Sequence, residues 1–408
     1  MDTTSTTALN PVISQRKPLR LLERLFVRLL RNLEGGCLQI EFPSGASVLV
    51  GDQSLPVTEL KILDSAFFAK VLRGGSVGFG EAYVDGLWTT QNLSETLKLL
   101  GQNQHRVGGL RKGFSLLVQQ LNRITHLARR NTVKQSRQNI HDHYDLSNTF
   151  YRHWLDQTMT YSSALFRTYD EPLELAQLNK IDRMLDLAGV ESGHHILEIG
   201  TGWGALALRA AQRGCRVTTI TLSEEQFIYA KARMEEAGLA AQVDLRLQDY
   251  RDLAGEYDAV VSCEMIEAVG REYLPSYFAK IRDCLKPGAR AVIQAITIPD
   301  DRYATYCKSC DWIQKHIFPG GHLPAPKAIY EHVNQAGGME VLSMQGFGRD
   351  YAETLRRWAD AFNAKQHAIR ELGFDERFQR KWNFYLSYCE AGFDADLIDV
   401  QHVVIRAN

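Results

Sequence analysis

Apolar and polar positions alternate in two different ways along the chain, and the clearer pattern begins near residue 190. There, short apolar runs typical of buried strands are separated by segments whose apolar residues recur at helical spacing. The runs predict strands at 194–200, 216–223, 243–249, 256–265, 290–298, 340–348 and 397–407, and the helical segments predict helices at 205–214, 224–238 and 273–288. Because strands that alternate with helices form parallel sheets, we expect an α/β fold with a doubly wound, mostly parallel sheet.

The first third of the chain has a different pattern. Residues 19–33 predict a basic amphipathic helix whose arginines lie mostly outside one apolar stripe. That stripe consists of Leu22, Leu25, Phe26, Leu29 and Leu33. A few short strands are expected within 36–65, then a helix that stops at Gly74-Gly75 and gives way to a glycine-rich turn. We therefore assign residues 1–130 to an N-terminal accessory domain and residues 131–408 to a catalytic domain.

Composition narrows the class of protein. The 408 residues, 45% of them hydrophobic and 23% charged, are typical of a soluble globular chain with two domains. No apolar run could span a bilayer and the polar start lacks the apolar stretch of a secretory signal, so we expect a cytoplasmic protein. Seven cysteines at scattered spacings argue against a disulfide framework. Cys307 and Cys310 form a CxxC, but no second CxxC or His pair at zinc spacing accompanies it, so no metal is expected.

Charge is distributed unevenly, although the net charge is only -1. Residues 101–141 contain no Asp or Glu, whereas Lys and Arg recur throughout the segment. Such a segment attracts a polyanion, either nucleic acid or an anionic membrane surface.

The segment GTGWG directly follows the first strand of the α/β pattern and opens a helix. Glycine at 200, 202 and 204 permits a tight turn and lets a ligand approach the backbone. The next strand ends in Thr221-Leu222 rather than in the acid expected for an NAD ribose. Glu198 before the loop instead gives the E/D-x-G-x-G form that S-adenosylmethionine (SAM) methyltransferases use.

Two further segments stand at the ends of strands. Asp249-Tyr250 follows the third strand, and CEMIEAVG at 263–270 follows the fourth. Because ligands bind at the carboxyl ends of parallel strands, we expect both segments to share one crevice with the glycine loop. A single member could instead serve as a turn or a helix cap.

Several segments in the same order resemble the cyclopropane-fatty-acyl-phospholipid synthases and the related mycolic acid cyclopropane synthases. They are HYDLSNTFYRHWLDQTMTYSSALF (143–166), EIGTGWG (198–204), TLSEEQ (221–226), EMIEAVG (264–270), IFPGGHLP (317–324) and GRDYAETLRRW (348–358). The segment LRGGSVGFGEAYVDGLW also resembles the accessory domain of the phospholipid enzymes, so the resemblance extends from about residue 60 to near the C-terminus.

The resemblance implies a class I SAM-dependent methyltransferase fold and a specific reaction. In that reaction SAM methylates the double bond of an unsaturated acyl chain in a membrane phospholipid, and a cyclopropane fatty acid forms. The resemblance also implies that SAM contacts Tyr161, Ser162, Gly200, Gly202, Thr221, Leu222, Gln226, Asp249 and Tyr250.

In the resembling enzymes a bicarbonate ion serves as the base, held by a Cys, a Glu, a His, a backbone amide and a Tyr. Here Glu267 and Tyr351 match the Glu and the Tyr, and Ile296 would supply the amide. Ser163 stands at the Cys position and Gln294 at the His position. Ser and Gln can still donate hydrogen bonds to a small anion, so either bicarbonate is retained or the product has changed.

Methylation of an alkene leaves a carbocation that the site must shield from water. Aromatic faces stabilise a cation, and the candidates are Tyr161, Trp203, Phe318 and Tyr351. Loss of a proton from the transferred methyl group to the base would then close the ring. The alternative within the same chemistry is a lipid C-methyltransferase that gives a branched or otherwise modified acyl chain without ring closure.

Two other functions remain as alternatives. An RNA methyltransferase is suggested by the basic segment, but no recognisable RNA-binding module accompanies it, so no nucleic acid partner is expected. A non-catalytic lipid-binding module is disfavoured by the complete GTGWG loop. We expect instead that the basic segment and the helix at 19–33 bind an anionic phospholipid surface at the inner face of the cell membrane. The resemblance of the accessory domain also implies a homodimer.

Overall fold

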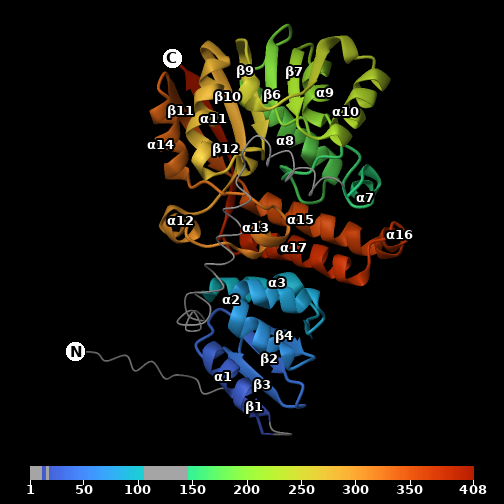
Figure 1. Ribbon diagram of the computed structural model, residues 1–408, viewed down its shortest axis with the longest axis vertical. Coiled ribbons are helices and arrows are strands. Elements are labelled where there is room, and N and C mark those ends of the chain that lie inside the picture. The colour runs from blue at the N-terminus through green and yellow to red at the C-terminus, as the bar shows by residue number, and fades with distance from the viewer. Residues whose placement is uncertain (1–11, 15–17, 105–145) are drawn as a thin grey trace, which may run out of the picture. The chain divides into compact units, whose positions relative to one another are not determined.

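Figure 1 shows the computed structural model of the chain, which describes residues 12–14, 18–104 and 146–408. The chain divides into two compact units. The first comprises residues 1–124 and 373–397, and the second comprises residues 125–372 and 398–408. The sequence analysis places all of 131–408 in one domain, whereas residues 373–397 pack with the N-terminal part of the chain. The functions assigned to the two domains remain predictions.

The first unit is built on a five-stranded sheet. Its strands lie in the order β1 (Val12–Ser14), β3 (Ser47–Gly51), β2 (Cys37–Glu41), β4 (Val57–Ile62) and β5 (Trp88–Thr89). Buried and more exposed residues alternate along β3, as expected for a sheet with one face in the core. Among the residues that the structure describes, the helices of this unit are α1 (Leu21–Leu30), α2 (Ala66–Val84), α3 (Leu93–Gln102) and α17 (Glu376–Asp394).

Helix α2 corrects one expectation. The backbone breaks at Gly75, where φ is 57° and ψ is -131°, as the Gly-Gly pair predicts. The expected turn after the break is wrong, because the helix resumes and continues to Val84. A Cβ at Gly78 would lie 2.2 Å from the carbonyl oxygen of Lys70, so glycine lets the second helical segment approach the first across the kink. Glycine here permits close packing of a helix rather than a turn.

The second unit contains the predicted doubly wound α/β sheet, with one strand reversed. The order is β11 (Met339–Gly346), β12 (Asp399–Ala407), β10 (Leu285–Thr297), β9 (Tyr257–Cys263), β6 (His195–Ile199), β7 (Arg216–Thr221) and β8 (Val243–Leu247). Neighbouring strands from β10 to β8 are parallel, whereas β12 is antiparallel to both β10 and β11. The sheet is therefore mixed, and each of the seven predicted strands is present.

Helices cover both faces of this sheet (Figure 1). On one face, α8 (Leu173–Leu187) and α9 (Ala205–Gln212) pack on alternate strand residues such as Ile196 and Val261. On the other, α11 (Leu274–Asp283) and α14 (Pro326–Ala336) pack on the intervening residues such as Leu197 and Val260. Successive side chains of a strand point to opposite faces, so both faces are apolar and the strands read as continuous apolar runs.

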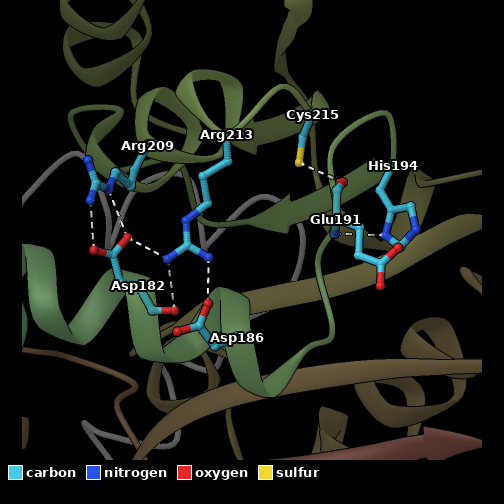
Figure 2. A network of polar contacts seen from close by, with 7 residues as sticks. All are labelled: Asp182, Asp186, Glu191, His194, Arg209, Arg213 and Cys215. Atoms are coloured by element: carbon cyan, nitrogen blue, oxygen red, sulfur yellow. Dashed lines mark hydrogen bonds and ion pairs between the residues drawn. The ribbon is translucent and has the colours of Figure 1, made fainter.

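An ion-pair network joins α8 to α9 (Figure 2). The carboxylate of Asp182 accepts two hydrogen bonds of 2.8 Å from the guanidinium of Arg209 and one of 2.7 Å from Arg213. Arg213 also donates to Asp186 at 2.6 Å. Bidentate guanidinium–carboxylate contacts have a fixed geometry, so the network holds α8 against α9 on their solvent side.

The remaining helices of the second unit follow the loops between strands. They are α7 (Asn148–Arg152), α10 (Glu224–Glu236), α12 (Asp300–Tyr306), α13 (Trp312–His316), α15 (Gly348–Ala364) and α16 (Gln366–Glu371), with short 3-10 turns η2 (Ala240–Gln242), η3 (Tyr250–Asp252), η4 (Ile266–Ala268) and η5 (Arg271–Tyr273).

Candidate functional site

The glycine loop lies between β6 and α9, as the sequence predicts. Gly200 and Gly202 have φ of +102° and +54°, in the left-handed region that glycine enters without strain. A Cβ at Gly204 would lie 2.9 Å from Met234 Cε and 3.1 Å from Ala230 Cβ, so α10 packs too closely for any side chain there. A Cβ at Gly202 would meet nothing within 4 Å, which leaves the loop backbone accessible to a ligand such as SAM.

The end of β7 carries three of the predicted SAM contacts. The hydroxyl of Thr221 donates to Gln226 Oε1 at 3.0 Å, and Ser223 caps α10 by accepting from Gln226 N at 3.2 Å. Leu222 between them is half-buried. These bonds fix the first turn of α10, the helix that packs against the glycine loop. Direct contact of these residues with SAM stays a prediction.

Asp249 and Tyr250 follow β8, the strand next to β7. The buried carboxylate of Asp249 accepts from Arg251 N at 2.9 Å and pairs with the Arg251 guanidinium at 3.2 Å. The ring of Tyr250 packs edge-on against Tyr277, with centroids 5.5 Å apart. Asp249 therefore caps η3, which is the structural role considered for a single member of the crevice, and its contact with adenine stays a prediction.

Tyr161 and Ser162 lie on the loop that joins α7 to α8. The hydroxyl of Ser162 accepts from Lys180 Nζ at 2.7 Å, and the carbonyl of Ser162 accepts from Gln177 Nε2 at 2.8 Å. Lys180 and Gln177 belong to α8 and are 1% and 0% exposed. Lys180 also donates to Cys263 Sγ, at the end of β9, at 3.3 Å. The buried polar face of α8 thus fixes this loop above the strand ends.

An aromatic cluster surrounds Tyr161. The other members of this cluster are Tyr151, Trp154, Trp203, Tyr351 and Trp358. Tyr161 and Tyr351 both contact Trp358, with ring centroids 5.4 and 6.2 Å away. Three of the four predicted aromatic candidates therefore share one cluster, and the fourth, Phe318, is half-buried after α13. Several ring faces at one place can stabilise a cation.

Three of the predicted bicarbonate ligands converge on Glu264, which the sequence analysis does not single out. Glu264 Oε1 accepts from Ser163 N at 2.9 Å and from Gln294 Nε2 at 2.7 Å. Glu264 Oε2 accepts from the Tyr351 hydroxyl at 2.7 Å. The backbone of Glu264 has φ of +49°, which is strained for a residue with a Cβ and is typical of functional positions. A carboxylate of the chain itself takes the hydrogen bonds that the Gln294 amide and the Tyr351 hydroxyl were predicted to donate to bicarbonate.

The surroundings of Glu264 shift its pKa in opposite directions. Burial raises the pKa of Glu264, while the donors Tyr351, Ser163 and Gln294 and the positive charge of Lys180 lower it. The donors to the carboxylate are all uncharged: a backbone amide, a side-chain amide and a hydroxyl. A carboxylate whose pKa remains raised despite three hydrogen bonds is more basic than an ordinary glutamate.

Ser163 contributes its backbone rather than its hydroxyl to the site. The Ser163 hydroxyl donates to the carbonyl of Ala164 at 2.9 Å. Gln294 is fixed from behind by His402, because Gln294 Oε1 lies 2.9 Å from His402 Nε2. Only a protonated Nε2 can donate to an amide oxygen, and this contact turns the Gln294 NH2 group toward Glu264.

His402 faces Gln294 across the β10–β12 pair. Burial lowers the pKa of His402 to about 3, so the imidazole is neutral at physiological pH. His402 Nδ1 has no hydrogen-bond partner among the described residues, which agrees with a neutral ring protonated at Nε2.

Glu267 and Ile296, the other two predicted ligands, bond to each other. Glu267 Oε1 accepts from Ile296 N at 2.6 Å. Burial, and then the negative charge of Glu264, raise the pKa of Glu267 to about 8. Two buried carboxyl groups disfavour being ionised together, because their negative charges repel each other. Glu267 is therefore mostly protonated at neutral pH.

Four residues of the candidate site were not predicted from the sequence: Lys180, Glu264, Trp358 and His402. Glu264 had a signal, because CEMIEAVG contains two glutamates at the end of a strand and only the second was assigned a role. His402 had no local signal, since its partner Gln294 is 108 positions away.

Three expectations depend on residues that the structure describes only in part or not at all: the basic segment, the absence of a membrane-spanning helix and the absence of a metal site. The basic side chains from Arg106 to Arg137 lie in the part of the chain that the structure does not describe. Across the described ranges, no helix is both long and apolar enough to cross a bilayer. Within the same ranges, no three His, Cys, Asp or Glu side chains are placed to hold a metal ion.

The chain is similar in sequence and fold to known proteins. The family model of mycolic acid cyclopropane synthetases matches residues 131–403, which include the whole candidate site. The chain belongs to this family. Its members include a tuberculostearic acid methyltransferase of Mycobacterium tuberculosis, UfaA1, which is 41% identical over 90% of this chain and 88% of its own length. The cyclopropane-fatty-acyl-phospholipid synthase of Escherichia coli is 33% identical over 85% of this chain and 87% of its own.

A solved structure extends the likeness to the cofactor. The mycolic acid cyclopropane synthase CmaA1, crystallised with S-adenosylhomocysteine and CTAB, superposes with a TM-score of 0.62. It is 29% identical in sequence and covers 66% of this chain and 98% of its own. The protein is therefore a SAM-dependent methyltransferase with a class I fold, and it belongs to a family that modifies lipids.

Proposed function

We propose that this synthetase-family protein methylates the double bond of an unsaturated acyl chain in a phospholipid and releases an open-chain product. The observation that carries the proposal is the position of Glu264. Its carboxylate takes the hydrogen bonds from Ser163, Gln294 and Tyr351 that would otherwise hold bicarbonate. The relative named as a tuberculostearic acid methyltransferase supports a fatty acyl substrate and a transferred methyl group.

SAM supplies an electrophilic methyl group, and its transfer to the alkene leaves a carbocation on the neighbouring carbon of the acyl chain. A C–H bond beside the cation then gives its electron pair to a new C=C bond, and the proton moves to Glu264. The product is a methyl-branched alkene and Glu264 ends protonated. The step needs no oxidant and no reductant.

Glu264 is suited to accept this proton. We propose that Glu264 is the carboxylate that is ionised during turnover, and burial raises its pKa, which makes it a stronger base than an exposed glutamate. Three donors hold both oxygens in place, so the base is already oriented before the cation forms.

The aromatic rings around Tyr161 would stabilise the carbocation. Tyr161 and Tyr351 both contact Trp358, and Tyr351 also donates to Glu264. The ring faces attract positive charge and exclude water, so loss of a proton is favoured over addition of water.

The difference from ring closure lies in where the base is held. A bound bicarbonate can lie beside the transferred methyl group, whereas a glutamate carboxylate reaches only as far as its own backbone allows. The backbone of Glu264 is fixed by its strained turn and by a 2.9 Å bond from its amide to the Gln294 carbonyl. A base held elsewhere removes a different proton, which supports a different product.

Cyclopropane formation is the second candidate, and one observation favours it. Glu267, Tyr351 and the Ile296 amide match the resembling enzymes, and all three lie at the same site. If Glu264 took a proton from the transferred methyl group, the same cluster would close the ring.

The two candidates can be separated by the product. Purified full-length protein is incubated with vesicles of a monounsaturated phospholipid and SAM that carries a trideuterated methyl group. The fatty acids are released and analysed by mass spectrometry before and after mild catalytic hydrogenation. We expect a product that retains three deuteriums and takes up two hydrogens, because a methyl-branched alkene keeps its methyl group and its double bond.

Other outcomes have definite meanings. A product with two deuteriums that resists hydrogenation is a cyclopropane and would overturn the open-chain proposal. A product with two deuteriums that still takes up hydrogen is also open-chain: a hydride has shifted from the methylated carbon to the cation, and a deuteron has then left the transferred methyl group to form the C=C bond. Label that enters added RNA and no lipid would overturn both candidates.

A further inference from the structure

Helix α1 of the first unit has three distinct faces around its axis. At 100° per residue, the buried face carries Glu23, Phe26, Val27 and Leu30. A second face carries Leu21, Leu22, Leu25 and Leu29, and a third carries Arg20, Arg24, Arg28 and Arg31. The leucine face adjoins the arginine face on one side and the buried face on the other.

The leucine face is largely exposed. Leu21, Leu22 and Leu25 are 66%, 43% and 47% exposed, and the four arginines are exposed as well. The sequence pattern instead groups Leu22 and Leu25 with Phe26 and Leu33 in a single apolar stripe. The structure divides that stripe, because Phe26 packs on Phe67 and Phe68 in the core while the leucines before it face outward.

We propose that the leucine and arginine faces of α1 dock the protein on a membrane that contains anionic phospholipids. A helix that lies in the membrane interface places its apolar side chains among the acyl chains and its basic side chains at the phosphates. Residues 20–31 contain four arginines and one glutamate, and that Glu23 is buried and accepts from the Arg20 backbone at 2.7 Å. The surface of α1 is therefore strongly positive beside an exposed apolar strip.

A second copy of the chain fits this face less well. In a symmetric contact the same surface meets itself, so the arginines of two copies would oppose one another. Phosphate groups instead complement the arginines, and their long side chains can reach the headgroups while the leucines lie deeper. The inference rests on the proposed function, since a phospholipid substrate must be reached in its membrane.

The test compares three variants of the full-length protein. Leu21→Gln/Leu22→Gln/Leu25→Gln removes the apolar strip, and glutamine keeps a high helix propensity. Arg24→Gln/Arg28→Gln removes charge only. The matched control is Leu72→Gln, which replaces an exposed leucine of α2 in the same unit. Circular dichroism and thermal unfolding establish that each variant is folded.

Binding is measured by flotation with vesicles of phosphatidylcholine alone and of equal parts phosphatidylcholine and phosphatidylglycerol. We expect the leucine variant to bind the mixed vesicles at least about tenfold more weakly than the wild type. Each arginine near an anionic surface contributes about fivefold, so the arginine variant should lose about 25-fold on mixed vesicles and nothing on neutral ones. The control should bind as the wild type does.

Turnover separates docking from chemistry. The leucine variant should keep wild-type activity on detergent-dispersed phospholipid and lose activity on vesicles. Unchanged vesicle binding, an equal loss in the Leu72→Gln control, or a smaller molecular mass of the leucine variant in solution would overturn the docking proposal. Wild-type protein that binds vesicles but forms no product from either substrate preparation would overturn the proposed function and leave the docking proposal standing.

Discussion

Two carboxylates of the second unit each accept three hydrogen bonds from side chains or backbone, yet they differ in burial, in the charge of their donors and in the direction of their pKa shift. Asp182 accepts from two guanidinium groups near the surface (Figure 2), and Glu264 accepts from three uncharged donors beneath it. The bonds from Arg209 lower the pKa of Asp182, whereas burial raises the pKa of Glu264. The number of hydrogen bonds is the same, and the charge of the donors and the burial differ.

The difference shows what makes a carboxylate structural or reactive. A cationic partner neutralises a carboxylate and removes its basicity, so Asp182 can only hold α8 against α9. Uncharged donors orient a carboxylate while leaving it a net negative charge and a raised pKa. Glu264 is therefore held in place and still able to accept a proton.

The largest expected effect is on Glu264 itself. Glu264→Gln keeps the size of the side chain and removes the base, so turnover of unsaturated phospholipid should fall about 100-fold or more. The measurement is methyl transfer from labelled SAM into lipid under saturating substrate. Asp182→Asn is the matched control, because it neutralises a carboxylate with as many donors outside the site, and its turnover should stay within about twofold of the wild type.

Removal of the Glu264 side chain tests whether bicarbonate can replace its carboxylate as the base. Glu264→Ala leaves the donors Ser163 N, Gln294 Nε2 and Tyr351 OH without a carboxylate, so added bicarbonate should restore at least about tenfold of the lost turnover. The wild type should be as active in bicarbonate-free buffer as in buffered bicarbonate. A wild type that loses activity without bicarbonate would show that the ion, not Glu264, is the base.

The next prediction concerns how the free energy of unfolding depends on pH through the Glu267 carboxyl group. Its pKa is about 8 in the folded protein against an ordinary value of 4.5, so its stabilising contribution is complete below pH 4.5 and declines as pH rises toward 8. Glu267→Gln cannot ionise, so relative to the wild type it should gain roughly 3 to 4 kcal/mol between pH 5 and pH 8. Denaturant unfolding of both proteins at these pH values measures the gain, and an equal difference at both pH values would contradict the raised pKa.

Loss of an uncharged donor should give a smaller change. Gln294→Leu removes one hydrogen bond to the ionised form of Glu264, so the pKa of Glu264 rises and the acid limb of the pH–rate profile moves to higher pH. Turnover at neutral pH should fall about tenfold. His402→Gln keeps an N–H group facing Gln294 and should shift the profile less than His402→Leu. An acid limb that stays in place in Gln294→Leu would separate Gln294 from the base.

The smallest effect is expected at the surface network. Asp182→Asn removes the ion pairs to Arg209 and Arg213, and the free energy of unfolding should decrease by about 1 kcal/mol. The decrease should shrink in high salt, because exposed ion pairs are screened. Thermal unfolding at low and high salt measures it, and a salt-independent loss would show that the network acts through packing instead.

The sheet of the second unit was predictable because each strand carries its own apolar run between turn residues. The reversal of β12 was not, since the direction of a strand depends on which neighbours it joins and its run of residues reads the same either way. In the first unit, the break at Gly75 was readable, but the helix after it depends on Gly78 packing against Lys70 across the kink. A close contact between two backbone segments cannot be read from the pattern of apolar and polar residues in either segment.

The candidate site divides in the same way. Tyr351 and Glu267 could be predicted as site residues because they lie within the segments GRDYAETLRRW and EMIEAVG, whose neighbouring residues identify them. Gln294 and Ser163 were recognised as substitutions at the expected anion site. Their shared hydrogen-bond partner Glu264 was not recognised, because only the folded structure shows that its side chain lies where the anion was expected. The role of His402 depends on the β10–β12 register, which no single segment encodes.

The order of segments along the chain has a consequence for synthesis. Residues 373–397 belong to the first unit, and only after them does β12 supply the strand between β10 and β11. During translation, every other strand of the second unit emerges before α17, yet the sheet cannot close until β12 has followed it. His402 arrives with that strand, so the group that turns Gln294 toward Glu264 is added at the end of assembly. A nascent chain that stops before β12 would carry the glycine loop without the His402 contact that orients Gln294 toward Glu264.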